Sequence, residues 1–410
     1  MNFETFNFHP SVAAGVAAAG YETPTPIQAR AIPQVFKGRD VMGLAQTGTG
    51  KTAAFVLPIL NRLVGSKYGC IRALIIAPTR ELAEQIHQAI EVLGRKTRIK
   101  SVAVYGGVGI NPQIQKLKHA DIVVACPGRL LDHIGRSSID LSQLEVLVID
   151  EADQLFDMGF IPDIRRILKQ LPMKRQTLLF SATMPPEIRR LAGDILRDPT
   201  NVQVGITAPA DTVSHALYPV AQHLKTALLL KLLGNTSTKS VLVFTRTKHR
   251  ARSLGKKLVA AGYRSASLQG NLSQTRRQAA LDGFRDGVFQ ILVATDIAAR
   301  GIDVTRISHV INYDIPSTPE AYIHRIGRTG RATRSGEAFT LVTGEDKDMV
   351  RAINRIIGSE VEQRTLSTFD YGSPALNRAG RSQWIGKPQR KLSGVKKRRN
   401  KTKSRSKFFI

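Results

Sequence analysis

Short apolar runs recur along this chain of 410 residues and alternate with longer stretches of helical periodicity. The runs occupy residues 72–77, 121–125, 145–149, 177–180, 240–244, 290–294, 308–312 and 337–342. They are rich in β-branched residues and do not alternate apolar with polar positions, which indicates strands buried on both faces. Such strands occur in parallel sheets whose crossover helices cover both faces. The predicted fold class is therefore α/β.

The runs fall into two groups on either side of residues 197–214, a stretch of Pro, Thr, Asp and Ser that is typical of a linker. We predict a first α/β domain over residues 1–206, a linker over 207–214 and a second α/β domain over 215–365. Residues 366–410 are predicted to be a disordered basic C-terminal tail, because few apolar residues are present to offset the entropy lost on ordering.

The formal net charge is +28, from 60 Lys and Arg against 32 Asp and Glu. Residues 378–410 carry +13 of it and no acidic residue, which leaves +15 for residues 1–377. This charge favours a polyanion as partner, and because no basic amphipathic helix or lipidation signal is present, nucleic acid is favoured over a membrane surface. No stretch approaches the roughly 18 apolar residues of a membrane span, and no secretion signal is recognisable at the N-terminus.

The two cysteines, Cys70 and Cys126, cannot supply a disulfide framework or a Cys-rich zinc site. Together with nine scattered His they offer no metal-ligand spacing. This usage suits a reducing compartment and predicts a cytoplasmic protein.

Residues 45–52 read AQTGTGKT and lie between the apolar run 41–44 and a helix-compatible stretch. A strand, a Gly-rich turn and a helix start are the context of a phosphate-binding P-loop. Its glycines let backbone N–H groups turn toward phosphate oxygens, while Lys51 brings a positive charge to the β- and γ-phosphates and Thr52 offers a hydroxyl to Mg²⁺. The first Gly of the general pattern is replaced by Ala45. The predicted nucleotide contacts are Ala45, Gln46, Thr47, Gly48, Thr49, Gly50, Lys51 and Thr52.

A second motif, VLVIDEAD at residues 146–153, delivers Asp150 and Glu151 to the end of a buried strand, where ligands gather in parallel sheets. We predict that Asp150 holds Mg²⁺, usually through water, and that Glu151 orients and deprotonates the attacking water. Alone, the acidic run could simply be a favourable helix start. Paired with residues 45–52, it predicts a site that binds and hydrolyses a nucleoside triphosphate with Mg²⁺.

AQTGTGKT followed by VIDEAD resembles the DEAD-box family of ATP-dependent RNA helicases, and the family's other motifs follow in order. They are PTPIQ (24–28), PTREL (78–82), Gly106-Gly107, CPGR (126–129), SAT (181–183), VFTRT (243–247), Gln274 with Arg277, ATDIAARGID (294–303) and HRIGRTGR (324–331). The resemblance covers residues 3 to about 360 and is closest in style to bacterial RhlE-type members. It implies two tandem RecA-like domains, ATP and Mg²⁺ as cofactors, and RNA as partner.

In the ATP site, the resemblance implies that Gln28 selects adenine and that Tyr21 stacks on the base. Asp303 is implied to read the ribose, while Arg328 and Arg331 resemble arginine fingers that stabilise charge on the transferred phosphoryl group. The implied catalytic residues are Lys51, Asp150, Glu151, Arg328 and Arg331. The residues implied to couple nucleotide state to domain closure are Asp153, Ser181, Ala182, Thr183 and His324.

For RNA, the resemblance implies contacts to phosphates and 2′-hydroxyls, and hence binding that does not depend on base sequence. The implied residues are Pro78, Thr79, Arg80, Gly107, Gly128, Arg129, Arg246, Gly270, Gln274, Arg277, Thr295 and Arg300. Two positions depart from the family pattern: Cys126 stands where Thr is usual, and Gln269 stands where His is frequent.

The expected function is ATP-driven opening of short RNA duplexes, in which the two domains close on ATP and single-stranded RNA and bend the bound strand. A non-enzymatic RNA clamp and a DNA helicase on the same core are alternatives; RNA-dependent phosphate release and a comparison of RNA with DNA separate them. The basic tail is expected to tether structured RNA, the alternative being a solvated end that only aids solubility.

Overall fold

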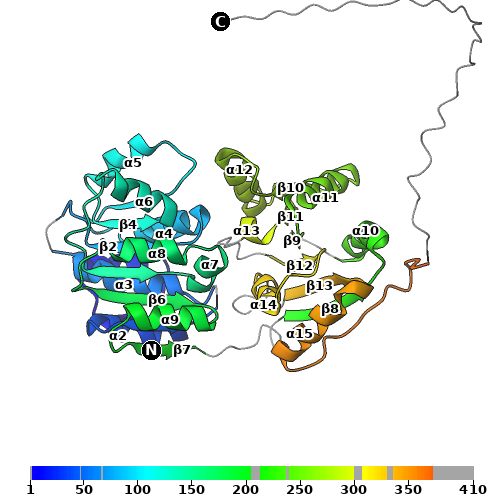
Figure 1. Ribbon diagram of the computed structural model, residues 1–410, viewed down its shortest axis with the longest axis horizontal. Coiled ribbons are helices and arrows are strands. Elements are labelled where there is room, and N and C mark those ends of the chain that lie inside the picture. Colours follow the sequence, from blue (N-terminus) through cyan, green and yellow to red (C-terminus); the bar gives the residue numbers. More distant parts are fainter. Residues whose placement is uncertain are drawn as a thin grey trace, which may run out of the picture. The chain divides into compact units, whose positions relative to one another are not determined.

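The computed structural model describes residues 2–46, 48–65, 68–204, 213–236, 240–299, 307–329 and 336–372. Within these ranges the chain forms two sheets flanked by helices, one in the N-terminal half and one in the C-terminal half (Figure 1). Every pair of neighbouring strands is parallel. The α/β prediction is confirmed. No helix in the described ranges has the length and apolar character needed to cross a membrane.

The first sheet has the strand order β3-β4-β2-β5-β6-β1-β7. Its strands are β1 (Val41–Leu44), β2 (Ala73–Ile76), β3 (Ser101–Val104), β4 (Ile122–Ala125), β5 (Val146–Ile149), β6 (Gln176–Ser181) and β7 (Thr200–Gln203). Its helices are η1 (Phe3–Phe6), α1 (Pro10–Ala18), α2 (Pro26–Phe36), α3 (Lys51–Leu63), α4 (Arg80–Leu93), α5 (Ile110–Leu117), α6 (Pro127–Gly135), α7 (Ala152–Asp157), α8 (Ile161–Leu168) and α9 (Pro186–Ile195).

Two apolar cores lie on opposite faces of this sheet. One joins the sheet to α1, α2, α3 and α4, and the other joins it to the α6–α9 side. The central strands β5, β6 and β1 are neighbours in the sheet, so the segments that follow them emerge side by side at its carboxyl edge. These segments are residues 45–52, the acidic motif at 150–153 and SAT. The topology therefore assembles three of the predicted motifs at one edge.

The second sheet has the order β10-β11-β9-β12-β13-β8. Its strands are β8 (Val213–Pro219), β9 (Val241–Phe244), β10 (Ser265–Leu268), β11 (Ile291–Ala294), β12 (His309–Asn312) and β13 (Gly336–Val342). Its helices are η3 (Gln222–Leu224), α10 (Lys225–Asn235), α11 (Lys248–Ala260), α12 (Gln274–Arg285), α13 (Asp296–Ala299), α14 (Pro319–Ile326), η4 (Gly344–Asp346) and α15 (Lys347–Ile357). Residues 213 and 214, which the sequence assigned to the linker, already belong to β8 and pair with β13; the linker residues 207–212 lie outside the described ranges.

The chain after α15 packs back onto the second sheet. The backbone N–H of Leu217 donates to the carbonyl of Glu362 (2.8 Å), and the N–H of Arg364 donates to the carbonyl of Leu217 (2.8 Å). Leu366, Phe369 and Tyr371 then pack against the apolar core of this domain. Residues 366–371, which the sequence placed in the tail, therefore belong to the compact unit that ends at Tyr371. The basic residues 373–410 lie outside the described ranges.

Candidate functional site

The turn after β1 has the backbone of an anion-binding loop. Gly48 and Gly50 have φ of 87° and 93°, the left-handed region that only glycine adopts without strain. Helix α3 starts at Lys51, so its first N–H groups and its positive dipole end face the turn. Lys51 is 6% exposed, and its ammonium donates to the carbonyl of Ala45 (2.7 Å). The positive charge is thus held inside the loop, where phosphate oxygens would bind.

The side chains of this loop also bond locally. The hydroxyl of Thr49 donates to the carbonyl of Gln46 (2.7 Å), while Thr52 is half-buried in the first turn of α3. Thr47 lies outside the described ranges.

Gln28, at the start of α2, is tied to this loop. Its Nε2 donates to the carbonyl of Gly50 (3.1 Å), and its Oε1 accepts from the N–H of Thr25 (2.9 Å). A Cβ on residue 50 would come within 2.5 Å of this amide, so glycine is also needed for the contact. These bonds use one N–H and one lone pair, and the amide has a second of each for a base. The Tyr21 ring lies 5.7 Å from the Phe3 ring and is 40% exposed, so one part of it is open for stacking.

The acidic pair at the end of β5 is deeply buried, with Asp150 2% and Glu151 3% exposed. Burial raises the pKa of Asp150 to about 7; the charge of Lys51 opposes this shift and Glu151 adds to it. Glu151 has φ of 50°, an uncommon conformation for a residue other than glycine, and its N–H donates to Oδ1 of Asp150 (2.9 Å). Strain of this kind concentrates at functional sites. The carboxylates are therefore held beside the loop lysine in a site of low dielectric.

Asp153 links the acidic motif to SAT. Its Oδ2 accepts from the N–H (2.9 Å) and the hydroxyl (3.0 Å) of Thr183, and its own N–H donates to Oγ of Ser181 (3.2 Å). Ala182, between the two hydroxyl residues, carries no polar side chain and is half-buried. From the second domain, Nε2 of His324 lies 3.7 Å from Oδ2 of Asp153. Burial lowers the pKa of His324, a shift that Asp153 opposes and the charge of Arg328 reinforces. The Asp153 carboxylate thus lies in contact with both SAT and the HRIGR motif.

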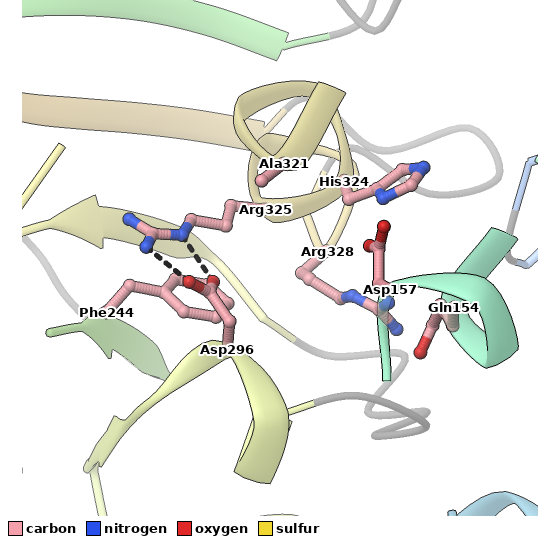
Figure 2. A pocket seen from close by; sticks show the side chains of 8 residues that line it. All are labelled: Gln154, Asp157, Phe244, Asp296, Ala321, His324, Arg325 and Arg328. Carbon is pink, nitrogen blue, oxygen red and sulfur yellow. Dashed lines mark hydrogen bonds and ion pairs between the residues drawn. The ribbon is translucent and has the colours of Figure 1, made fainter. Parts of the chain in front are cut away.

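Arg328 is the predicted arginine finger that lies within the described ranges. It is 5% exposed and lines a small cavity of about 40 Å³. Figure 2 shows its side chain extending toward Gln154 and Asp157. The cavity is lined by Gln154, Asp157, Phe244, Asp296, Ala321, His324, Arg325 and Arg328. The predicted residues Asp303, Arg331 and Arg300 lie outside the described ranges.

The predicted RNA contacts of the first domain lie in turns and at helix starts. Gly107 has φ of 80°, which favours glycine, and a Cβ there would come within 2.1 Å of Nη1 of Arg80 and displace that guanidinium. Thr79, beside the buried Pro78, caps α4 by accepting from the N–H of Leu82 (3.2 Å). Arg129 donates twice to the carbonyl of Val108 (3.1 Å each), while nothing lies within 4 Å of a Cβ on Gly128.

Two side-chain pairs join these residues to the predicted contacts of the second domain. Nη1 of Arg80 donates to Oε1 of Gln274 (3.3 Å), and Arg277 donates through Nε to Oε1 of Glu81 (3.0 Å). In the second domain, Arg246 is exposed at the end of β9, Gly270 is open around its Cβ position, and Thr295 follows β11. The two sets of sequence-predicted residues therefore meet at the Arg80–Gln274 and Arg277–Glu81 contacts.

The two departures from the family pattern have different surroundings. Cys126 occupies the N-cap position of α6 without a capping hydrogen bond from its side chain, and burial raises the pKa of its thiol to about 12, so it stays a neutral thiol near pH 7. Gln269 is 5% exposed and its Oε1 accepts from the N–H of Asn271 (2.9 Å), which stabilises its own turn.

Sequence reasoning missed a buried cluster behind the HRIGR motif. Arg325 is 3% exposed and forms a bidentate pair with Asp296 (2.6 and 2.7 Å), while its Nη1 donates to the carbonyl of Asp314 (2.7 Å) (Figure 2 shows the pair with Asp296). The Asp314 carboxylate accepts from the N–H of Arg246 (2.9 Å) and from Nη1 of Arg250 (2.6 Å). The signal was available, because Asp314 comes two residues after the buried strand β12, and Asp150 likewise comes at the end of a buried strand, β5.

Comparison with known proteins bears on both halves of the chain. The family model described as DEAD/DEAH box helicase matches residues 25–191, and the model described as Helicase conserved C-terminal domain matches residues 224–333. The DEAD-box ATP-dependent RNA helicase CshA of Bacillus subtilis is 42% identical over 374 residues, which are 90% of this chain and 75% of that protein. The chain belongs to the DEAD-box family of ATP-dependent RNA helicases. The DEAD-box ATP-dependent RNA helicase RhpA of Helicobacter pylori is 44% identical over 372 residues, 90% of this helicase and 75% of the relative.

Solved structures agree with this placement. This helicase resembles S. cerevisiae Dbp5 bound to RNA and ADP BeF3, with a TM-score of 0.79, 31% identity, and coverage of 88% of this chain and 95% of the other. A DEAD box protein from the hyperthermophile Methanococcus jannaschii matches with a TM-score of 0.54 and 36% identity, over 89% of this chain and 99% of the other. The two parallel sheets are thus RecA-like domains, and the helicase is an RNA-dependent ATPase that opens short RNA duplexes.

Proposed function

We propose that the side chains at the carboxyl edge of the first sheet form the ATPase centre of this helicase. Lys51 neutralises charge on the β- and γ-phosphates, and Glu151 takes the proton of the attacking water. Gln28 and Tyr21 bind the adenine, and Asp303 binds the ribose from the second domain. The observation that carries this proposal is the burial of Asp150 and Glu151 beside Lys51, where electrostatic interactions are strong because water is excluded.

Mg²⁺ fits the donors present. No group of three or more His, Cys, Asp or Glu in the described ranges could hold a metal alone, and Mg²⁺ is commonly held by one or two protein oxygens plus phosphates and water. Asp150 and the hydroxyl of Thr52 would hold it. When bound, Mg²⁺ would neutralise charge on the β- and γ-phosphates.

Closure would bring Arg328 and Arg331 to the γ-phosphate, with the Asp153–His324 contact reporting nucleotide state to the second domain. The 3.7 Å approach of these two groups supports this coupling role, together with the hydrogen bonds from Asp153 to SAT. RNA would lie along the residues that meet at Arg80–Gln274 and Arg277–Glu81, and would be held by backbone contacts that ignore base sequence.

Steady-state ATP hydrolysis with saturating RNA tests the assignments. Glu151→Gln should lower the turnover number at least roughly 10²-fold because the general base is lost, and a change within about twofold would reject that role. Arg331→Ala should abolish RNA-stimulated turnover and spare ATP binding; an unchanged turnover number removes Arg331 from the finger role. Glu187→Gln, an exposed carboxylate on α9, is the matched control and should change neither.

Three finer assignments belong to the same proposal. The RhlE-type placement rests on the style of the motifs, while the relatives named above are CshA and RhpA. A cytoplasmic location rests on the cysteine usage. The basic tail would tether structured RNA: with about five phosphate contacts to a single strand, truncation after Tyr371 should reduce the log–log salt slope of RNA binding by roughly 3 to 4 units. An unaltered slope and affinity would count against the tether.

A further inference from the structure

The positive charge of the two-domain body is concentrated in one segment. Residues 212–281 contain 12 Lys and Arg and no Asp or Glu, so they hold +12 of the +15 carried by residues 1–377. This segment includes β8, η3, α10, β9, α11, β10 and the first part of α12. In Figure 1, α11 and α12 lie at the β10 end of the second sheet. The part of the segment that lies at this end, residues 246–281, holds nine Lys and Arg and no Asp or Glu.

Helix α11 displays most of this charge to solvent. Its inward side consists of Ala251, Leu254, Gly255 and Leu258. Gly255 lets the helix lie close to β10, because a Cβ there would be 3.3 Å from Cβ of Ser267. On the outward side Lys248, Arg252, Lys256 and Lys257 are all exposed. We call these four residues the α11 basic face.

Carboxylates from other elements do not neutralise the α11 basic face. In residues 212–281, Lys225 and Arg250 form ion pairs with Asp314, and Arg277 forms one with Glu81. Within the described ranges, no carboxylate forms an ion pair with Arg252, Lys256 or Lys257. Lys248 donates instead to the neutral Oδ1 of Asn271 (3.2 Å). The face is thus an uncompensated cationic surface, which attracts polyanions.

The α11 basic face is continuous with the proposed RNA path. Helix α11 begins two residues after Arg246, and its bond from Lys248 to Asn271 joins it to the turn that contains Gly270. Lys248, Arg252 and Lys256 follow at four-residue spacing, so they form a row that extends about 12 Å from the predicted core contacts. An RNA backbone that leaves the core next to Arg246 would meet this row.

The composition of the face indicates which part of the RNA it binds. Helix α11 contains no Phe, Tyr or Trp, so it offers no platform on which unpaired bases could stack. Lysines and an arginine on a helix without Phe, Tyr or Trp suit phosphates whose bases are already paired with each other. We propose that the α11 basic face binds the phosphate backbone of the duplex that flanks the single strand held in the core. This inference rests on the proposed RNA path and adds a second RNA-binding surface to it.

The test uses the full chain with the substitutions Arg252→Gln, Lys256→Gln and Lys257→Gln together, because Gln keeps helix propensity and removes charge. Kd is measured, with a non-hydrolysable ATP analogue, for a short unstructured RNA strand and for the same strand joined to a hairpin. The triple variant should raise the Kd for the tailed hairpin roughly tenfold or more, and lower its salt slope by about 2 to 3 units. Kd for the single strand and ATP turnover stimulated by that strand should stay within about twofold, since the core contacts remain.

Two control variants distinguish a specific effect of the α11 basic face from a general loss of charge and from a structural effect. Lys169→Gln, Lys174→Gln and Arg190→Gln remove the same charge from exposed positions of the first domain and should leave hairpin binding unchanged. Arg252→Lys with Lys256→Arg and Lys257→Arg keeps the charge and should bind like the wild type, which a purely structural role would not require.

Equal loss in the triple variant and the first-domain control would overturn the proposal, as would no loss in either. Equal loss for single strand and hairpin would assign the face to the core path instead. If poly-glutamate binding depends on the face while RNA binding does not, the partner is an acidic protein and the proposal is wrong. An absence of strand-stimulated turnover in the wild type would reject the proposed core function, which is a separate result.

Discussion

Replacing Asp314 with alanine removes the acceptor at the centre of a buried cluster in the second domain. Its side chain is 2% exposed, and its carboxylate accepts from Nη1 of Arg250 (2.6 Å) and the N–H of Arg246 (2.9 Å). Nζ of Lys225, with a side chain 3% exposed, lies 3.9 Å away. Because the Arg250 side chain is 42% exposed it can return to water, whereas Lys225 stays buried. Breaking a buried pair of this kind should lower the free energy of unfolding by about 3 to 5 kcal/mol.

The same substitution should make stability depend on pH in the alkaline range. Burial already lowers the pKa of Lys225 below its ordinary value of 10.5, and the Asp314 carboxylate opposes that shift. Without the carboxylate, the pKa of folded Lys225 falls further, so over that range the unfolded chain binds more protons than the folded one. Stability then increases with pH. The deficit of the variant is complete below the folded pKa of Lys225 and shrinks as pH rises toward 10.5.

Native-state hydrogen exchange of peptides from β9 and β12 would measure this, because it reports the opening free energy of the second domain separately. The control is Asp348→Asn, which removes a charge from an exposed pair with Arg351 in the same domain and should cost less than about 1 kcal/mol. A loss for Asp314→Ala no larger than that of the control, or a deficit that grows with pH, would refute this reasoning.

Three further substitutions or modifications test other parts of the site. Gly107→Ala should weaken RNA binding about tenfold, since its Cβ would come within 2.1 Å of Nη1 of Arg80 at a left-handed φ, with ATP affinity unchanged; equal RNA affinity by fluorescence anisotropy would contradict this. Arg325→Lys cannot reproduce the bidentate pair with Asp296 and should lower RNA-stimulated turnover about tenfold or more; a normal turnover number would remove the pair from catalysis. Because burial raises its pKa to about 12, the Cys126 thiol should react with iodoacetamide at pH 8 at least roughly tenfold more slowly in the folded protein than in urea, and equal rates by mass spectrometry would contradict that burial.

The strands predicted from the sequence lie in the interior of the two sheets. The strands that were not predicted lie at the sheet edges. All eight apolar runs correspond to strands, and Val41–Leu44 adds β1. The missed strands β3, β7, β8 and β10 stand at the ends of the two sheets. An edge strand is covered less completely, so sequences such as TNVQ and SASL keep polar residues and lack the continuous apolar signal. Prediction from apolar runs therefore works for a strand that is covered on both faces and has a neighbouring strand on each side.

The functional residues also divide into those predicted from the sequence and those seen only in the structure. Motif spacing led to Lys51 and Asp150, in the segments that follow the buried strands β1 and β5, whereas the role of Asp153 was implied by the family resemblance. Motifs did not indicate that Asp314 would bind the backbone of Arg246, since this contact joins segments 68 residues apart in the chain. Nor does a sequence motif show that the α11 basic face lies beside the turn of Gly270. Such contacts depend on strand order, which is a property of the whole sheet.

In the proposed mechanism, RNA triggers ATP hydrolysis at the carboxyl edge of the first sheet. Phosphate release by the full chain, measured with saturating ATP and with single-stranded RNA, single-stranded DNA or no nucleic acid, tests it most directly. Turnover should be at least about tenfold faster with RNA than with DNA or without nucleic acid, and Glu151→Gln should lose that stimulation. Equal turnover under the three conditions, or full stimulation in the Glu151→Gln variant, would contradict it.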